Sequence, residues 1–286
     1  MSASSPAIDR SGSANASAND AAITAERVET KYLVSPAELP ALTRAISSKL
    51  EAHRFTGEAA NRLPGAQHFV TTIYFDTPTR AYFGAAKHNQ QSNLKIRAKE
   101  YYDLHPSLAE LATDPEQILR YQPWLWFELK RREGMTTSKR RFRFPKAAAA
   151  TLFDENRAPG DLPEGGSERE DADALIGHVH AQAERVAPSA IVNYRRLSFQ
   201  NPDSTLRVTI DLGLSFFPVP KDLFRRPRPL SKSELGRPAG VEPRAVVEVK
   251  RRAFLPSWLE QALTTAAGSP VSFSKFVAAS EAIHGG

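Results

Sequence analysis

The chain has 286 residues, a hydrophobic fraction of 41% and a charged fraction of 24%, which is ordinary for a globular protein with a substantial core. Its net charge of +6 is compatible with an anionic partner, but it does not separate nucleic acid from phosphate compounds or acidic membranes. The absence of cysteine excludes disulfides, thiolate metal sites and cysteine nucleophiles. No run approaches the roughly 18 apolar residues that a membrane span needs.

Residues 1–22 consist largely of Ser, Ala, Asn and Asp and contain no apolar signal-peptide segment. This composition cannot bury enough surface to order itself, so a disordered tail is predicted. Residues 23–286 are expected to form one domain, and a cytoplasmic protein is the default expectation.

The elements expected after the tail alternate between strands and helices. A strand followed by Ser35-Pro36 predicts a helix start, because Ser is a good N-cap and Pro suits the first helical position. Gly- and Pro-rich composition predicts loops at 156–171 and 221–243, and 103–122 is interpreted as an insertion. Strands are expected at 26–34, 68–75, 92–101, 123–132, 137–144, 189–200, 205–217 and 244–252, and helices at 36–50, 80–86, 146–153, 172–186, 256–263 and 271–283. This pattern predicts an α+β protein built on an eight-stranded antiparallel β-barrel, closed or nearly closed, with flanking helices.

Several of these strands carry a charge at every second residue. Side chains alternate faces along a strand, so each run has one apolar face and one ionic face. A solvated outer face is the ordinary explanation for any single run. The charges are mostly basic, however, and like charges on neighbouring strands repel unless carboxylates or an anion lie among them. A multiply charged, polyphosphate-like anion is therefore the expected ligand. The runs are Lys95-Arg97-Lys99, Glu128-Lys130-Arg132, Lys139-Arg141-Arg143 and Glu248-Lys250.

A series of short segments, in this order, resembles one known family. They are ETKYLV at 29–34, IYFD at 73–76, LKIR at 94–97, FELK at 127–130, YRRLSFQ at 194–200, RVTID at 207–211, AVVEVK at 245–250 and FSKF at 273–276. The chain thus resembles the catalytic domain of the vacuolar transporter chaperone (VTC) polyphosphate polymerases, within the triphosphate tunnel metalloenzymes. The resemblance implies an eight-stranded tunnel, a divalent cation (Mn²⁺ or Mg²⁺), and transfer of the ATP γ-phosphate to a growing polyphosphate. ATP and inorganic polyphosphate are the expected partners; nucleic acid is not expected, and any membrane or accessory partner is unknown.

The same resemblance implies roles for individual side chains. The phosphate-binding catalytic bases would be Lys31, Lys95, Arg97, Lys130, Arg141, Arg196 and Lys275. Further substrate contacts would come from Tyr194, Ser274, Lys139, Arg143, Arg207 and Lys250. The metal carboxylate would be Glu248, with Glu128 or Glu29 assisting. Hard oxygen ligands of this kind suit a metal that bridges phosphate oxygens.

The sequence departs from the triphosphate-hydrolysing relatives at one position. Their Glu-x-Glu-x-Lys signature here becomes Arg27-Val28-Glu29-Thr30-Lys31, so a base replaces the first carboxylate. This favours a polymerase over a hydrolase. The alternatives are a triphosphatase or nucleotide phosphohydrolase of the same fold, a non-catalytic polyphosphate-binding module and, more weakly, a nucleic-acid binder. Trp124, Trp126 and Trp258 are interpreted as packing residues.

Overall fold

The computed structural model describes residues 28–53, 67–89, 92–102, 124–134, 136–155, 157, 159, 166–225, 235–252 and 254–285. The expected N-terminal tail, Arg27 and the 103–122 insertion lie outside these residues. The strands are β1 (Val28–Val34), β2 (Glu51–Ala52), β3 (Gln67–Asp76), β4 (Ser92–Tyr102), β5 (Trp124–Glu133), β6 (Thr136–Pro145), β7 (Ala187–Gln200), β8 (Leu206–Phe217), β9 (Gly240–Glu242) and β10 (Ala245–Arg251). The helices are α2 (Leu39–Ser47), α3 (Ala81–His88), α6 (Lys146–Phe153), α7 (Gly166–His180), α8 (Ser257–Ala267) and α9 (Lys275–His284), with a 3₁₀ turn, η2 (Leu223–Arg225).

Several of the expected helices have different bounds in the structure. Helix α2 begins at Leu39 with Glu38 as its N-cap, so the expected start at Pro36 after Ser35 is wrong, and it ends at Ser47. Helix α7 begins at Gly166 and ends at His180, so part of the predicted 156–171 loop is helical and the predicted helix end near residue 186 is wrong. Helix α8 continues to Ala267, and α9 begins only at Lys275. The cause at α9 is local, because the Ser274 hydroxyl caps the helix by accepting a hydrogen bond from the Val277 N–H at 3.4 Å.

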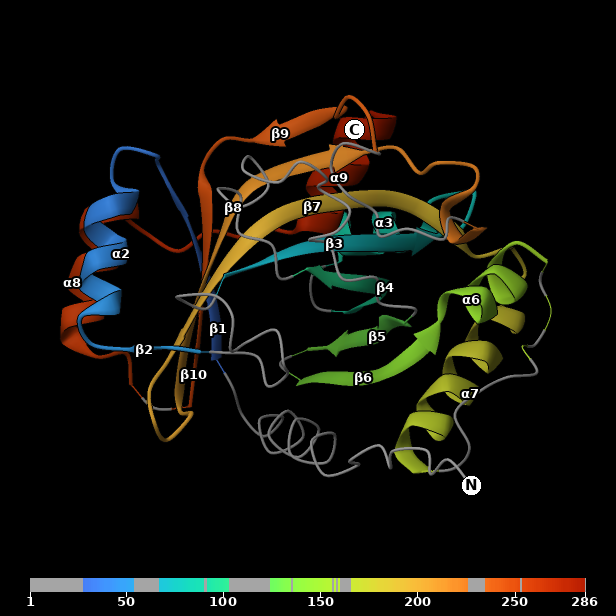
Figure 1. The fold of residues 1–286 in the computed structure, drawn as a ribbon, viewed down its shortest axis with the longest axis horizontal. Helices are drawn as coiled ribbons and strands as arrows, with labels where there is room; N and C mark the ends of the chain where they lie inside the picture. Colours follow the sequence, from blue (N-terminus) through green and yellow to red (C-terminus); the bar gives the residue numbers. More distant parts are fainter. Residues whose placement is uncertain are drawn as a thin grey trace, which may run out of the picture.

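All strand pairs are antiparallel, and eight strands follow one hydrogen-bonded path in the order β1-β10-β8-β7-β3-β4-β5-β6 (Figure 1). The short strands β2 and β9 pair with β7 and β8. The α+β architecture with eight antiparallel strands is therefore confirmed. Within the described residues no ladder joins β1 to β6, so the barrel is not closed by backbone hydrogen bonds.

Side chains show that the sheet curls back on itself. Strand β1 is the first in the sheet order and β5 the seventh, yet Lys130 Nζ on β5 lies 3.7 Å from Glu29 Oε2 on β1. A flat sheet would hold these strands far apart, since neighbouring strands are about 4.8 Å apart. The ion pair therefore places the two ends of the sheet opposite one another across a concave inner face.

A β-bulge bends the sheet between β7 and β8. The register shifts between Asn193 and Arg195, so that Gly213 and Leu214 on β8 oppose the single residue Tyr194 on β7. Gly213 adopts φ +61°, a conformation that glycine takes without the steric cost of a side chain. The bulge lies on β8 between Asp211, which points inward with the bases, and Leu214, which is buried in the core.

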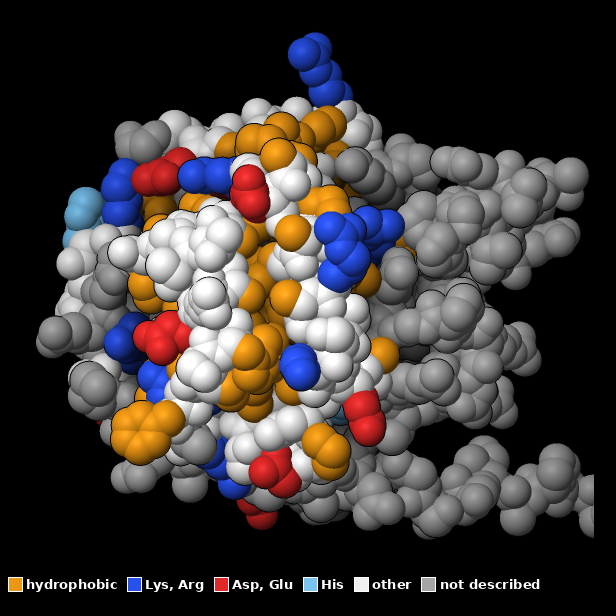
Figure 2. All heavy atoms as spheres, turned by 90° about the vertical axis from the view of Figure 1, so that its left-hand side faces the viewer, with side chains coloured by type: hydrophobic (Ala, Val, Ile, Leu, Met, Phe, Trp, Pro, Cys, Tyr) orange, Lys and Arg blue, Asp and Glu red, His pale blue; other side chains and the backbone are white. Residues whose placement is uncertain are grey.

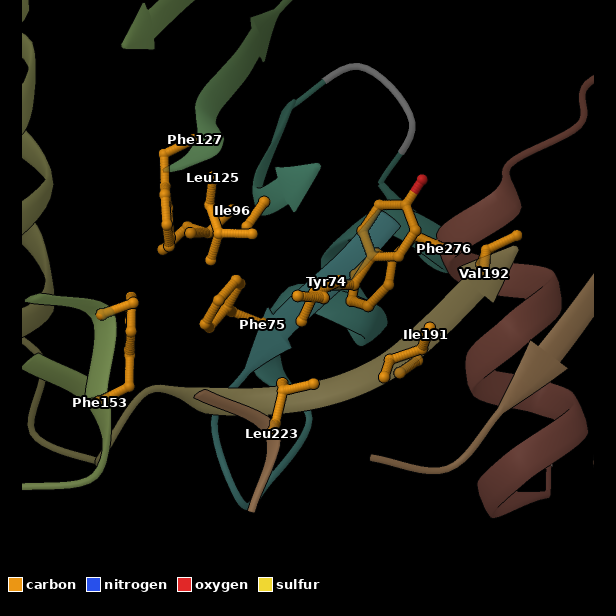
Figure 3. Packing of buried hydrophobic residues seen from close by; sticks show 14 of the residues in the cluster. Tyr74, Phe75, Ile96, Leu125, Phe127, Phe153, Ile191, Val192, Leu223 and Phe276 are labelled. Atoms are coloured by element: carbon orange, nitrogen blue, oxygen red, sulfur yellow. The ribbon is translucent and has the colours of Figure 1, made fainter. Parts of the chain in front are cut away.

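The outer face of the sheet is apolar and packs under helices in two clusters. In the larger one, rings of Phe75, Phe127, Phe142 and Phe153 stack near α6, with Phe127 and Phe153 centroids 5.8 Å apart (Figure 3). The smaller cluster lies under α2 and α8. Figure 2 views the side that carries these two helices; hydrophobic side chains lie along its middle and the charges are scattered, so the bases do not gather there.

Helix α9 is fixed at both ends. At its C-terminal end the Arg80 guanidinium donates to the Gly285 carbonyl at 3.2 and 3.3 Å, and Lys87 Nζ lies 2.9 Å from Glu281 Oε1. At its N-terminal end stands the Ser274 cap, which faces the inner side of the sheet. No helix within the described residues is long and apolar enough to cross a membrane.

The aromatic packing gives a stability prediction. Phe127→Ala removes a fully buried ring that contacts four other phenylalanines, so the free energy of unfolding should fall by about 3–5 kcal/mol. Urea denaturation measures this change. The matched control is Phe254→Ala, whose side chain is 96% exposed and should change stability by about 0.5 kcal/mol or less. Equal effects of the two substitutions would contradict the assigned core.

Candidate functional site

The inner face of the sheet is ionic because charged residues alternate with core residues along each strand. On β4, Lys95 and Arg97 point inward while Ile96 and Ala98 are buried in the outer core. Neighbouring strands continue the pattern in register, since Lys95 is paired with Lys130, Arg97 with Glu128, and Glu128 with Arg141. The sequence period thus places bases directly opposite other charges.

Glu128 is the anion at the centre of one half of this face. Its side chain is 2% exposed, and its oxygens lie 2.5 Å from Arg97 and 3.1 Å from Lys99. Arg141 follows at 3.7 Å and Lys139 at 3.9 Å. Burial raises the pKa of Glu128, but Arg97, Lys99, Lys139 and Arg141 more than offset it and hold that pKa well below its usual range. Glu128 is therefore a permanent counter-charge for four bases.

Asp211 plays the same part in the other half. Its carboxylate is fully buried and accepts two hydrogen bonds from the Arg196 guanidinium, at 2.6 and 2.7 Å. Lys275 Nζ, at the start of α9, lies 2.6 Å from the second oxygen. Burial raises the pKa of Asp211, and Arg196 and Lys275 bring it below its usual value. The ring of Tyr194 lies below both cations, 5.1 Å from Lys275 Nζ and 5.4 Å from the Arg196 guanidinium carbon.

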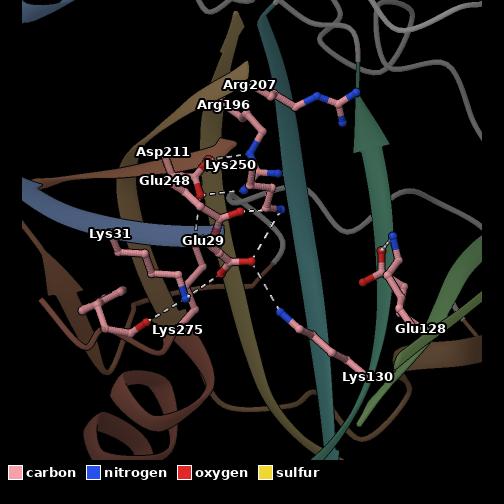
Figure 4. Close-up of polar contacts among 12 residues, drawn as sticks. Glu29, Lys31, Glu128, Lys130, Arg196, Arg207, Asp211, Glu248, Lys250 and Lys275 are labelled. Carbon is pink, nitrogen blue, oxygen red and sulfur yellow. Dashed lines mark hydrogen bonds and ion pairs between the residues drawn. The ribbon is translucent and has the colours of Figure 1, made fainter. Parts of the chain in front are cut away.

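Glu29 and Glu248 form a third group with three lysines (Figure 4). Lys250 Nζ lies 2.5 Å from Glu248 and 3.9 Å from Glu29, which also contacts Lys31 at 3.3 Å and Lys130 at 3.7 Å. The Glu248 charge and burial raise the pKa of Glu29, but Lys250, Lys130 and Lys31 leave it below its usual value. Burial also raises the pKa of Glu248, and the surrounding bases hold it well below its usual range.

Lys95 loses its proton more readily than a free lysine. Burial lowers its pKa, and the like charges of Lys31, Lys130 and Arg97 lower it further, to about 8. Its Nζ lies 3.5 Å from the Ser274 hydroxyl. Lys95 therefore stands where β1, β4, β5 and the start of α9 converge.

The remaining predicted residues lie at the edge of this arrangement. Arg207 on β8 is in register with Lys250 and donates to the Gln200 side-chain oxygen at 2.7 Å. The Arg143 guanidinium lies 6.0 Å from the Trp126 ring, and Arg141 covers the same ring at 4.3 Å.

Three inward-facing residues were not assigned to the site from sequence. Lys99 continues the register of Lys95 and Arg97, and that register alone could have identified it. Asp211 follows Arg207 at a spacing of four, which also places it on the inner face. Tyr74 on β3 hydrogen-bonds Arg97, and burial raises its pKa; no sequence feature distinguished it from a core tyrosine.

The carboxylates fit a divalent cation at one place better than at others. Glu29 and Glu248 lie on adjacent strands and share Lys250, and their mutual repulsion would be relieved by a cation. Among the described residues no three acidic or histidine side chains gather into a complete metal site. Two carboxylates suit Mg²⁺, which is commonly held by one or two carboxylates and substrate phosphates, and Mn²⁺ takes the same hard oxygen ligands. Glu128 fits less well, because its oxygens are already surrounded by four bases.

Comparison with known families now identifies the chain. The family model of the VTC domain matches residues 26–284. The chain belongs to the VTC domain family. The resemblance drawn from the short segments is thereby confirmed over nearly the whole length, and the ionic inner face described above is the candidate site of a VTC domain.

Two solved structures show distant similarity to this VTC domain. A candidate adenylyl cyclase from Hippeastrum, described as having a dominant triphosphatase activity, is 13% identical over 80% of each chain, with a TM-score of 0.43. A candidate adenylate cyclase from Bacillus halodurans is 13% identical over 87% of this chain and 93% of that one, also with a TM-score of 0.43. None of the curated proteins matches the chain.

The lowered pKa of Lys95 predicts a pH-dependent affinity for tripolyphosphate. Lys95 is charged below its pKa of about 8 and neutral above it, so affinity should fall as pH rises through this value. A bound anion raises that pKa, which shifts the fall upward. Calorimetric titrations between about pH 7 and 9 should show a smaller fall in Lys95→Arg, since arginine stays charged.

Some slope should remain in Lys95→Arg, because burial also lowers the pKa of Lys130. The exposed Lys49→Arg substitution is the matched control and should follow the unmodified protein. An affinity that is constant over this range, or equal slopes in Lys95→Arg and the unmodified protein, would contradict the prediction.

Two isosteric substitutions separate a metal ligand from a counter-charge. Glu128→Gln leaves four bases uncompensated, so it should lower the free energy of unfolding by about 3–5 kcal/mol and leave Mn²⁺ affinity unchanged. Glu248→Gln should weaken Mn²⁺ binding by about tenfold or more, because it removes an anionic ligand. Urea denaturation and Mn²⁺ titration by electron paramagnetic resonance measure the two effects. Weakened Mn²⁺ binding in Glu128→Gln would instead make Glu128 a ligand.

Proposed function

We propose that this VTC domain is a metal-dependent polyphosphate polymerase that transfers the γ-phosphate of ATP to a growing polyphosphate chain. The observation that carries the proposal is the charge balance of the inner face. Among the described residues, ten bases from six strands and α9 converge there with four carboxylates, Glu29, Glu128, Asp211 and Glu248. The excess of positive charge suits a polyanion, and such a face would not be stable on grounds of packing alone.

The bases reach the inner face from strands spread across the sheet. Arg97 comes from β4, Arg196 from β7 and Lys31 from β1, so a phosphate chain between them would be held along its length. Phosphoryl transfer depends on in-line positioning and on cations around the transferred group rather than on covalent work by the protein. Arginine supplies paired donors and lysine a point charge.

The proposed metal would lie at Glu29 and Glu248. These two carboxylates would hold a divalent cation, Mn²⁺ or Mg²⁺, whose chemistry there would be to offset the negative charge of the phosphates. Lys250 contacts both carboxylates, so it would keep them ionised and oriented. Glu128 and Asp211 would act through the bases that they hold, without touching the metal.

The state of the carboxylates supports phosphate rather than water as the acceptor. All four have a pKa below the usual value, which makes each a weak general base. A water nucleophile must give up a proton in the course of the reaction, whereas a terminal phosphate oxygen of polyphosphate is already anionic. We place the reaction in the cytoplasm, where ATP is abundant.

The test is product analysis after incubation with ATP and Mn²⁺, with separate assays for acid-stable polymer and for free phosphate. Polymer should exceed free phosphate. Arg27→Glu restores the first carboxylate of the hydrolase signature and should shift the products towards free phosphate, because a second metal could then activate water.

Three outcomes decide between the candidates. Mainly orthophosphate without polymer would establish a triphosphatase. Binding of polyphosphate without turnover under any divalent metal would make the domain a binding module. Polymer formation by Glu248→Gln at an unchanged rate would remove the metal role from that carboxylate.

A further inference from the structure

Trp126 is an aromatic side chain among the charges that β5 presents inward. Along this strand Trp126, Glu128 and Lys130 share a face, while Leu125 and Phe127 are buried in the outer core. In the ladder, Trp126 lies between Lys99 on β4 and Arg143 on β6. A large aromatic ring thus occupies a position at which both neighbouring strands carry basic residues.

Core packing does not account for this ring. Trp126 belongs to neither hydrophobic cluster and is only partly buried, in contrast to the expectation that it is a packing residue. Its contacts are cationic: the Arg141 guanidinium carbon lies 4.3 Å from the ring centroid and that of Arg143 lies 6.0 Å away. Arginines over an indole form a flat, polarised platform of the kind that stacks on planar ligands.

The position of this platform matches the size of a nucleoside triphosphate. Trp126 and Lys130 are four residues apart on one strand, or about 13 Å at the usual rise per residue. Lys130 contacts Glu29, one of the two carboxylates that fit the metal. A triphosphate with its terminal phosphate near Glu29 would run past the arginines and lysines that surround Glu128. Its ribose and nucleobase would then lie towards Trp126.

We infer that Trp126, with Arg141 and Arg143, forms the nucleobase subsite and stacks on the purine ring of ATP. The inference rests on the proposed use of ATP and adds the direction in which the nucleotide lies along the inner face. Stacking is sequence-tolerant, so other purine nucleoside triphosphates should bind similarly, whereas a phosphate chain without a base gains nothing from the ring.

The rival explanation is that Trp126 merely orders Arg141. Arg141 also contacts Glu128, so it belongs to the phosphate-holding group. If the ring served only to position this guanidinium, its loss would weaken ATP and tripolyphosphate equally. ATP carries a nucleoside that tripolyphosphate lacks, so a loss of affinity confined to ATP is assigned to the nucleoside.

The experiment measures dissociation constants of ATP and of tripolyphosphate by calorimetry for the full chain and its variants. Trp126→Leu should weaken ATP binding by about tenfold and leave tripolyphosphate within about twofold of the unmodified protein. Trp126→Tyr keeps an aromatic face and should recover most of the ATP affinity. Trp258→Leu, on α8 beside the smaller core cluster, is the matched control and should change neither ligand.

Equal weakening of both ligands in Trp126→Leu, or no change in either, would overturn the inference. Thermal denaturation of each variant shows whether it is folded, and Trp126→Tyr provides the test if Trp126→Leu is not. Because binding is measured without turnover, these outcomes are independent of whether polymer forms. A domain that binds ATP through Trp126 and makes no polymer would refute the proposed polymerase and leave this subsite intact.

Discussion

Repulsion among bases crowded on one concave face is the interaction that shapes this protein. Arg97, Lys99, Lys139 and Arg141 can share a small volume only because the buried Glu128 carboxylate lies among them. Asp211 has the same effect on Arg196 and Lys275. The carboxylates compensate part of the charge and leave the remainder for a ligand. The hydrophobic core is accordingly displaced outward, between the sheet and its helices.

The same contacts that curl the sheet also bring the residues of the site together. The two ends of the strand order meet through Glu29 and Lys130 rather than through a backbone ladder in the described part of the chain. The Gly213 bulge bends β8 between Asp211, which faces inward, and Leu214, which lies in the core. Formation of the inner face therefore requires the outer core, the bulge and the ionic contacts together, which is typical of cooperative folding.

Sequence reasoning could predict the faces of the strands but not their partners. A period of two identifies Lys95 and Arg97 as residues on one face without reference to any other strand. The bounds of this strand, expected at 92–101, agree with β4 to within one residue. The pairing of Glu128 with bases from β4 and β6 depends on register, which alternation does not fix. Trp126 was misjudged for a related reason, because an aromatic residue carries the same apolar label whether it packs in a core or covers a guanidinium.

The attachment of α9 gives the site a mechanical connection to the end of the chain. The helix spans ten residues, about 15 Å, and its two ends make different contacts. Its first residue, Lys275, contacts Asp211 together with Arg196. Its C-terminal end is held by Lys87 of α3 and by Arg80, the residue before α3. A stiff rod held in this way transmits displacement along its axis. A displacement of the C-terminal end of α9 by a fused segment or a neighbouring subunit would thus move the Lys275 ammonium group among the phosphate-binding bases.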